Sequence, residues 1–190
     1  MQAVRMILGL VYLAALLSVP VAGGRLGALA DLRLRRPGLA VAAIVLQVVI
    51  VSLLPGGSHG LHVAVHIGSY LLLGAFAWAN RRMTGVPVIA LGGALNFAAI
   101  AANGGVMPAD PAALASLAHA TPHGDFANSA ALAHPKLLFL GDVLATPASW
   151  PVHNVYSVGD IVIVAGVLVL LHVACGTRLV PRRLVRAVTG

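Results

Sequence analysis

Glutamate is absent from this 190-residue sequence, cysteine occurs once, and charged residues make up only 9% of the chain. Because Cys175 has no second cysteine to pair with, no disulfide can form within the chain. Helix packing must therefore hold the fold together, and redox chemistry is not expected. The acidic residues are five aspartates: Asp31, Asp110, Asp125, Asp142 and Asp160.

Apolar residues, in contrast to charged ones, are abundant. They make up 59% of the chain, and the mean hydropathy is +0.96, which exceeds what one soluble core is expected to bury. The 21 glycines suit close contact between helices in lipid, where small residues let two backbones approach. The composition therefore predicts an integral membrane protein with the lipid bilayer as its first partner.

Five long apolar runs predict an all-α fold, an integral membrane five-helix bundle. Each run has close to the ~20 residues that are needed to cross a ~30 Å hydrocarbon core. The expected spans are residues 6–21, 39–54, 61–80, 86–102 and 158–175. The second, bounded by Pro37 and Pro55, is the shortest. The first could also be the apolar region of a signal peptide, but the basic residues that follow it favour a retained anchor.

The basic residues predict how such a bundle would be oriented. All of them except Arg5 and Lys136 fall on one side when the five spans alternate, and cytoplasmic loops are the basic ones. The N-terminus is then expected outside and the C-terminus in the cytoplasm. The pI of about 11.1 is explained by this asymmetry without a nucleic-acid partner. Residues 25–36 read either as an interfacial helix on anionic lipid or as a solvated loop.

Residues 103–157 are expected to form a long extracytoplasmic loop between the fourth and fifth helices. A connection of this length is uncommon inside a compact domain, and long loops often carry function. Within it, Asp110 followed by Pro111 predicts the N-cap and first turn of a short helix.

Two aspartates near the fifth run give the sharpest catalytic hypothesis. Asp160 lies just inside the start of that run, and Asp142 precedes it in the same outer region. Two carboxyl groups brought together can share a proton, one acting as base and the other as acid. The alternatives are a capping box formed by Ser157 and Asp160 and a plain turn at Asp142. The polar residues expected to support the pair are Asn103, Asn154, Asn96, Ser157 and Tyr70.

His62 and His66 are spaced four residues apart on the third run, so they would share one helix face. Such a pair can bind a metal ion. No glutamate follows the first histidine and no cysteine is near, so packing or hydrogen-bonding roles are the favoured alternative. No cofactor is expected.

Several short strings resemble an uncharacterised bacterial membrane family that is known only as a domain of unknown function. The match extends over nearly the whole chain, and the strings that carry it are Gly23-Gly24-Arg25, Ser69-Tyr70, Asn80-Arg81-Arg82, Asn96, Asn103-Gly104-Gly105, Gly141-Asp142 and Asn154 to Asp160. The resemblance implies a location in the bacterial cytoplasmic membrane and supplies no activity.

The segment from Pro151 to Asp160 also resembles the last-helix motif of lipoprotein signal peptidases, which are membrane aspartyl enzymes. This resemblance implies a catalytic role for Asp160, with two extra residues between Asn154 and the acid. The second aspartate motif of that family is absent, and Asp142 would have to replace it. The sequence therefore predicts a non-catalytic accessory or carrier protein with an outward-facing polar site, which would bind a membrane protein or peptide partner. The alternative is a membrane-embedded aspartyl hydrolase.

Overall fold

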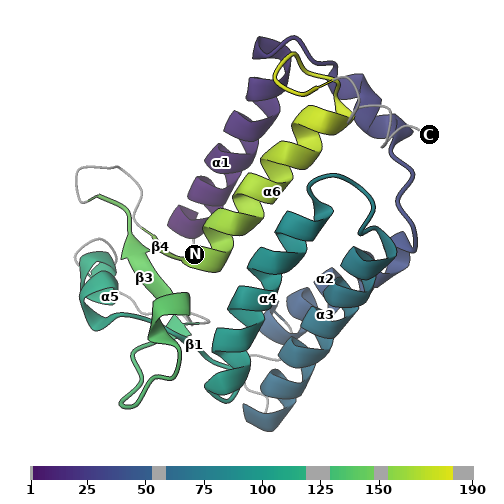
Figure 1. Ribbon diagram of the computed structural model, residues 1–190. Coiled ribbons are helices and arrows are strands. Elements are labelled where there is room, and N and C mark those ends of the chain that lie inside the picture. The colour runs from purple at the N-terminus through teal and green to yellow at the C-terminus, as the bar shows by residue number, and fades with distance from the viewer. Residues whose placement is uncertain (1, 53–58, 119–128, 148–153, 182–190) are drawn as a thin grey trace.

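The computed structural model describes residues 2–52, 59–118, 129–147 and 154–181, most of which are helical (Figure 1). The six α-helices are α1 (Gln2–Val21), α2 (Pro37–Ser52), α3 (His59–Ala79), α4 (Val86–Ala102), α5 (Pro111–Ala118) and α6 (Val158–Ala174). Two short 3-10 helices cover Leu26–Asp31 and Leu138–Leu140. The strands are β1 (Met107–Pro108), β2 (Ser129–Ala130), β3 (Asp142–Ala145) and β4 (Val155–Ser157).

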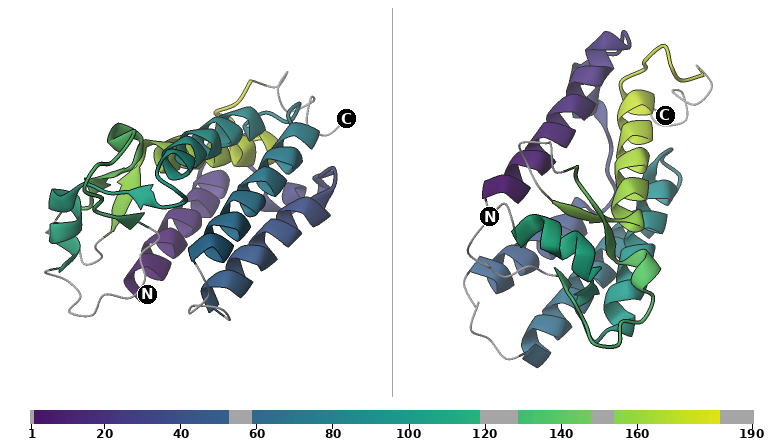
Figure 2. Two further views of the ribbon diagram at one scale, coloured as in Figure 1. Left: turned by 90° about the horizontal axis from the view of Figure 1, so that it is seen from below. Right: turned by 90° about the vertical axis from the view of Figure 1, so that its left-hand side faces the viewer.

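The five long helices form a row in which each packs on its neighbours. α4 packs against α6 on one side and α3 on the other; α2 covers α3, and α1 lies along α6 (Figure 1). The strands and α5 lie beside the C-terminal end of α4 and the N-terminal end of α6 (Figure 2). The arrangement places the described residues between α4 and α6 over one end of the central helices.

Helices α4 and α6 approach closely because glycines face each other across their contact. A Cβ atom added at Gly92 would lie 2.5 Å from the carbonyl oxygen of Gly159 and 2.7 Å from Ile163 Cγ1. A Cβ at Gly166 would lie 2.6 Å from the backbone nitrogen of Ile89. These distances are too short for any side chain, so the glycines set the separation of the two helices.

Two small sheets join the segment between α4 and α6 to the helices. β1 pairs in parallel with β2, and β3 pairs antiparallel with β4, so that Asp142 lies opposite Ser157. A further parallel bridge joins Ala109 to Asp142. A small apolar core of Ala99, Ile100 and Met107, with Tyr70 and Leu140 packed on it, anchors this region to the end of α4.

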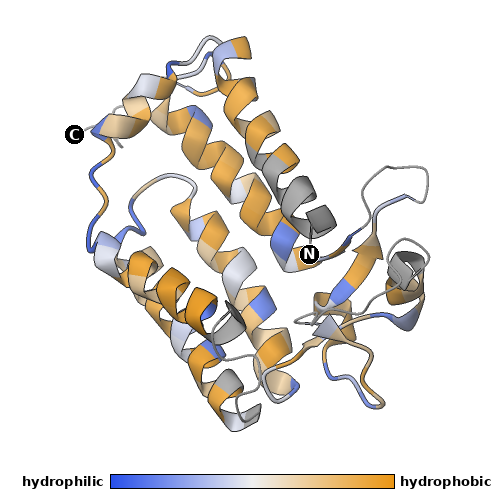
Figure 3. Cartoon of the chain, turned by 180° about the vertical axis from the view of Figure 1, so that it is seen from behind, coloured by the Kyte–Doolittle hydropathy of each residue, from blue (hydrophilic) through white to orange (hydrophobic). Residues whose placement is uncertain are grey.

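The integral membrane five-helix bundle predicted from composition is wrong. Within the described residues, no helix combines the length and the apolar character needed to cross a membrane. α2, α4 and α6 have 16, 17 and 17 residues; at 1.5 Å per residue they rise only ~24–26 Å, short of a ~30 Å hydrocarbon core. Figure 3 shows hydrophilic residues between the apolar ones of the described helices.

The expectation of an all-α fold with a long loop at residues 103–157 also needs correction. The described part of that segment contains α5, all four strands and a 3-10 helix. The predicted short helix is confirmed, because Asp110 Oδ1 accepts a hydrogen bond from the Ala112 backbone N–H at 2.7 Å just before α5. In residues 25–36, where an interfacial helix was one alternative, the helical part is the 3-10 helix Leu26–Asp31.

Replacing Gly92 with alanine should destabilise the fold, because the new methyl group would meet backbone atoms of α6 that cannot rotate away. Overpacking of this kind typically costs ~1–3 kcal/mol. Thermal unfolding should show the loss as a lower midpoint. Gly93→Ala is the matched control: nothing lies within 4 Å of its Cβ position, and alanine is favoured over glycine in a helix by ~1 kcal/mol. Equal midpoints for the two variants would contradict the close approach of α4 and α6.

Candidate functional site

Asp160 lies in the first turn of α6 and forms a capping box with Ser157. The Ser157 hydroxyl oxygen accepts a hydrogen bond from the Asp160 backbone N–H at 3.0 Å. In return, Asp160 Oδ2 accepts one from the Ser157 backbone N–H at 3.0 Å. The pair satisfies two amide groups that a helix start leaves without partners. The capping alternative drawn from the sequence is therefore confirmed.

Asn96 on α4 closes this cap into a network across three elements. Its side-chain amide donates to Asp160 Oδ1 at 2.8 Å, and its oxygen accepts from the Ser157 hydroxyl at 2.8 Å. Gly159 makes room for the amide, since a Cβ there would collide with Asn96 Oδ1. Each carboxylate oxygen of Asp160 thus holds a hydrogen bond from within the fold, and Ser157 is fully buried.

Asp142 begins β3 beside this network and is only 9% exposed. Its backbone oxygen accepts from the Asp110 N–H at 3.1 Å, which ties the strand to the start of α5. Burial, and to a smaller extent the negative charge of Asp160, raise the pKa of Asp142 from its ordinary 3.8 to about 6, against the opposing effect of a side-chain hydrogen bond with Ser129. A carboxyl with this pKa exchanges its proton near neutral pH.

Tyr70 on α3 completes the group that the structure brings together. Its pKa is raised to about 12, first by burial and then by the charges of Asp160 and Asp142. Its ring stacks in a tilted row between His66, at 5.3 Å between centroids, and Phe97, at 5.5 Å. Residues from α3, α4, β3, β4 and α6 therefore converge on one polar junction, which we call the carboxyl junction: Tyr70, Asn96, Asp142, Ser157 and Asp160.

Two of the predicted supporting residues hold backbone segments together. Asn103 donates to the Lys136 carbonyl oxygen at 2.7 Å and accepts from the Lys136 N–H at 2.8 Å. It also donates to the Ala99 carbonyl oxygen at 2.7 Å. The backbone N–H of Asn154 donates to the Thr146 hydroxyl oxygen at 2.9 Å. The hydrogen bonds of Asn103 and of the Asn154 backbone thus stabilise the conformation of the segment that contains Asp142.

The proposed histidine pair falls partly outside what the structure describes. The side chain of His62 lies outside the described residues. His66 is within 3.4 Å of the Gln47 amide nitrogen, and burial lowers its pKa below the ordinary value. Among the described side chains, no group of three or more histidine, cysteine, aspartate or glutamate residues is placed to hold a metal ion.

Sequence reasoning missed one residue of this site. Ser129 hydrogen-bonds the Asp142 side chain, and β2, which contains it, is held by parallel pairing to β1. A lone serine in a connecting segment shows no spacing pattern that would single it out. Only the pairing of strands distant in sequence could identify it.

The fold and the junction define a mostly helical protein with two small sheets and a buried carboxyl cluster. The chain belongs to a family of unknown function (DUF5317), which matches residues 31–172. The resemblance to a family of unknown function is thereby confirmed. No curated protein matches the chain, and no solved structure does.

The raised pKa of Asp142 predicts how stability depends on pH. The folded state holds this proton more tightly than the unfolded chain, so the contribution is fully present below about pH 4 and is lost as pH rises through about 6. Asp142→Asn mimics the protonated form. The variant should match the wild type near pH 4 and exceed its free energy of unfolding by up to ~3 kcal/mol near pH 7. Urea titrations across this range measure the difference, and a difference independent of pH would contradict the shift.

Removing the Ser157 hydroxyl should destabilise the start of α6. Ser157→Ala leaves the Asp160 N–H and the Asn96 side-chain oxygen without this partner in a buried setting. Loss of an N-cap typically costs ~1–2 kcal/mol. Chemical unfolding should report this loss, whereas Val158→Ala, which truncates the partly exposed next side chain, should cost less. If Ser157→Ala unfolds like the wild type, the cap does not stabilise the fold.

Proposed function

We propose that this protein is a non-catalytic binding protein whose carboxyl junction binds a cationic group, such as an ammonium group, of a ligand or partner. The observation that carries the proposal is the state of Asp160, whose two carboxylate oxygens each hold a hydrogen bond from Asn96 or Ser157. An acid and base pair needs a second carboxylate that is free to hold water. Asp160 is instead committed to the helix cap.

The charge of the junction supports a cationic ligand. The negative charge of Asp160 raises the cost of ionising Asp142, and no ion pair compensates either carboxyl group within the described residues. A positive group beside Asp142 would relieve this repulsion. The ring row of His66, Tyr70 and Phe97 borders the junction, and aromatic faces attract organic cations. Binding should therefore strengthen as pH rises through about 6, where Asp142 loses its proton.

An aspartyl hydrolase is the second candidate, and one observation favours it. Two carboxyl groups with different surroundings, one of them with a raised pKa, are the usual arrangement of an acid and its base. Asp142, with a pKa of about 6, fits the role of the acid. The closed hydrogen-bond network around Asp160 weighs against the role of base.

Titration calorimetry of the full chain with spermidine tests the binding proposal. We expect Asp142→Asn to weaken binding about tenfold or more, since one charge-assisted contact is worth ~1.5–3 kcal/mol. Asp110→Asn is the matched control: it removes one negative charge next to Asp142 in the same strand network, and asparagine still caps a helix. If Asp142→Asn and Asp110→Asn bound spermidine with the same affinity as each other, the proposal would be contradicted. If the wild-type protein released peptides from casein, and both Asp142→Asn and Asp160→Asn abolished this activity, the hydrolase would be favoured instead.

A further inference from the structure

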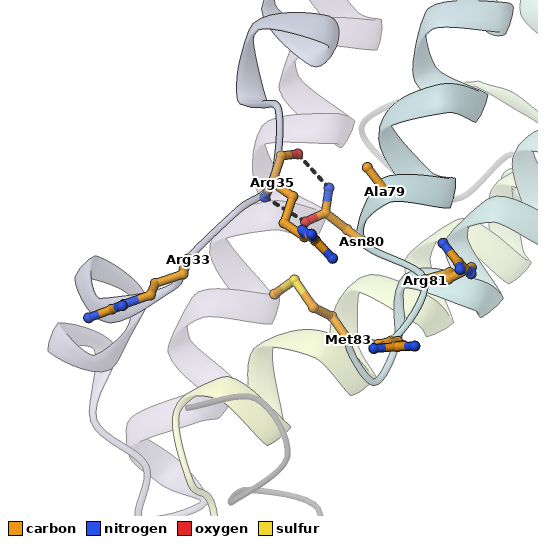
Figure 4. A pocket seen from close by; sticks show the side chains of 7 residues that line it. Arg33, Arg35, Ala79, Asn80, Arg81 and Met83 are labelled. Carbon is orange, nitrogen blue, oxygen red and sulfur yellow. Dashed lines mark hydrogen bonds between the residues drawn. The ribbon is translucent and has the colours of Figure 1, made fainter. Parts of the chain in front are cut away.

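A separate cavity lies at the C-terminal end of α3 and shares no lining residue with the carboxyl junction (Figure 4). It has a volume of about 160 Å³. One wall is the segment just before α2, and the other is the turn that joins α3 to α4. Its lining residues include Arg33, Arg35, Asn80, Arg81, Arg82 and Met83. Four guanidinium groups thus belong to residues around one small hollow.

Asn80 holds the two walls of this cavity in a fixed relation. Its side-chain oxygen accepts a hydrogen bond from the Arg35 backbone N–H at 2.8 Å, and its amide donates to the Arg35 carbonyl oxygen at 2.9 Å. The amide also donates to the Phe76 carbonyl oxygen at 2.8 Å. With only 2% of its surface exposed, Asn80 is a buried clamp between segments 45 residues apart. The fold therefore holds the backbone segments that carry Arg33, Arg35, Arg81 and Arg82 in a fixed relation.

Most of these guanidinium groups are available to a ligand. Arg81 is partly engaged, since it donates to the Trp78 carbonyl oxygen at 2.8 Å and lies 4.3 Å from the centre of the Trp78 ring. For the side chains of Arg33, Arg35 and Arg82, the described part of the chain provides neither an ion pair nor a hydrogen bond. All four arginines are exposed. Mutual repulsion of their charges is thus not offset by a carboxylate among the described residues.

We propose that the cavity lined by Arg33, Arg35, Arg81 and Arg82 binds a phosphate-bearing group. The planar guanidinium fork matches the spacing of phosphate oxygens and forms two parallel charge-assisted hydrogen bonds with them. A bound dianion would neutralise the repulsion within the cluster. The small hollow of about 160 Å³ between two clamped walls suits one or two phosphate groups rather than an extended polyanion. The same chemistry belongs to free phosphate and to a phospholipid headgroup. The site does not depend on the carboxyl junction.

Binding measurements on the full chain with two probes test this site and separate the two sources. One arm titrates inorganic pyrophosphate calorimetrically. The other measures co-flotation with vesicles of phosphatidylcholine alone or with phosphatidylglycerol added. We expect Arg35→Ala combined with Arg82→Ala to weaken binding of the responding probe at least about tenfold. Pyrophosphate binding indicates a soluble phosphate compound, and binding only to phosphatidylglycerol vesicles indicates a lipid headgroup.

The control removes the same charge from exposed arginines outside the cavity, through Arg25→Ala combined with Arg178→Ala, and should leave binding within about twofold of the wild type. Equal loss in the control, or no binding of either probe by the wild type, would overturn the proposal. Arg35→Lys combined with Arg82→Lys guards against misfolding of the alanine variant. It keeps the charge but loses the fork, so it should bind more weakly than the wild type. Wild-type binding by this variant would also overturn the proposal.

Discussion

The close contact between α4 and α6 is the constraint on which the rest of the structure depends. Gly92 and Gly159 allow the two backbones to approach, and only at that distance can the Asn96 amide reach both Ser157 and Asp160. The cap of α6 is therefore completed by a residue of α4. Because β4 leads directly into α6 and pairs with β3, the same contact fixes where Asp142 lies.

The positions of the helices could be predicted from the sequence because apolar runs of helical length leave few alternatives. The fourth run, residues 86–102, coincides with α4, and the fifth ends within one residue of α6. The same runs led to the wrong prediction of membrane-spanning helices. An apolar stretch of 16 or 17 residues fits a membrane span only approximately, and hydropathy does not measure the length of the finished helix.

Local spacing predicted the polar features that depend on neighbouring residues, and it failed for those that depend on distant ones. The Ser157 and Asp160 box and the cap at Asp110 were readable because a cap needs only two to four consecutive residues. The bond from Asn96 to Asp160 spans 64 residues, and that from Asn80 to Arg35 spans 45. No local pattern in the sequence predicts such pairs, because only the fold brings the two residues of each pair together.

Neutral side-chain amides link segments that are distant in sequence, a role that ion pairs have in many proteins. Asn80, Asn96 and Asn103 each hydrogen-bond a segment at least 33 residues away in sequence, and the described residues contain no ion pair in compensation. An asparagine amide does not titrate, so the links that Asn80 and Asn103 make to backbone groups keep their strength across the pH range. Changes in pH then act mainly through a group such as Asp142, whose pKa lies near 6, without loosening the clamps at either end of α4. Such an arrangement lets charge accumulate at separate places, acidic at the carboxyl junction and basic at the arginine cavity, while the scaffold between them stays neutral.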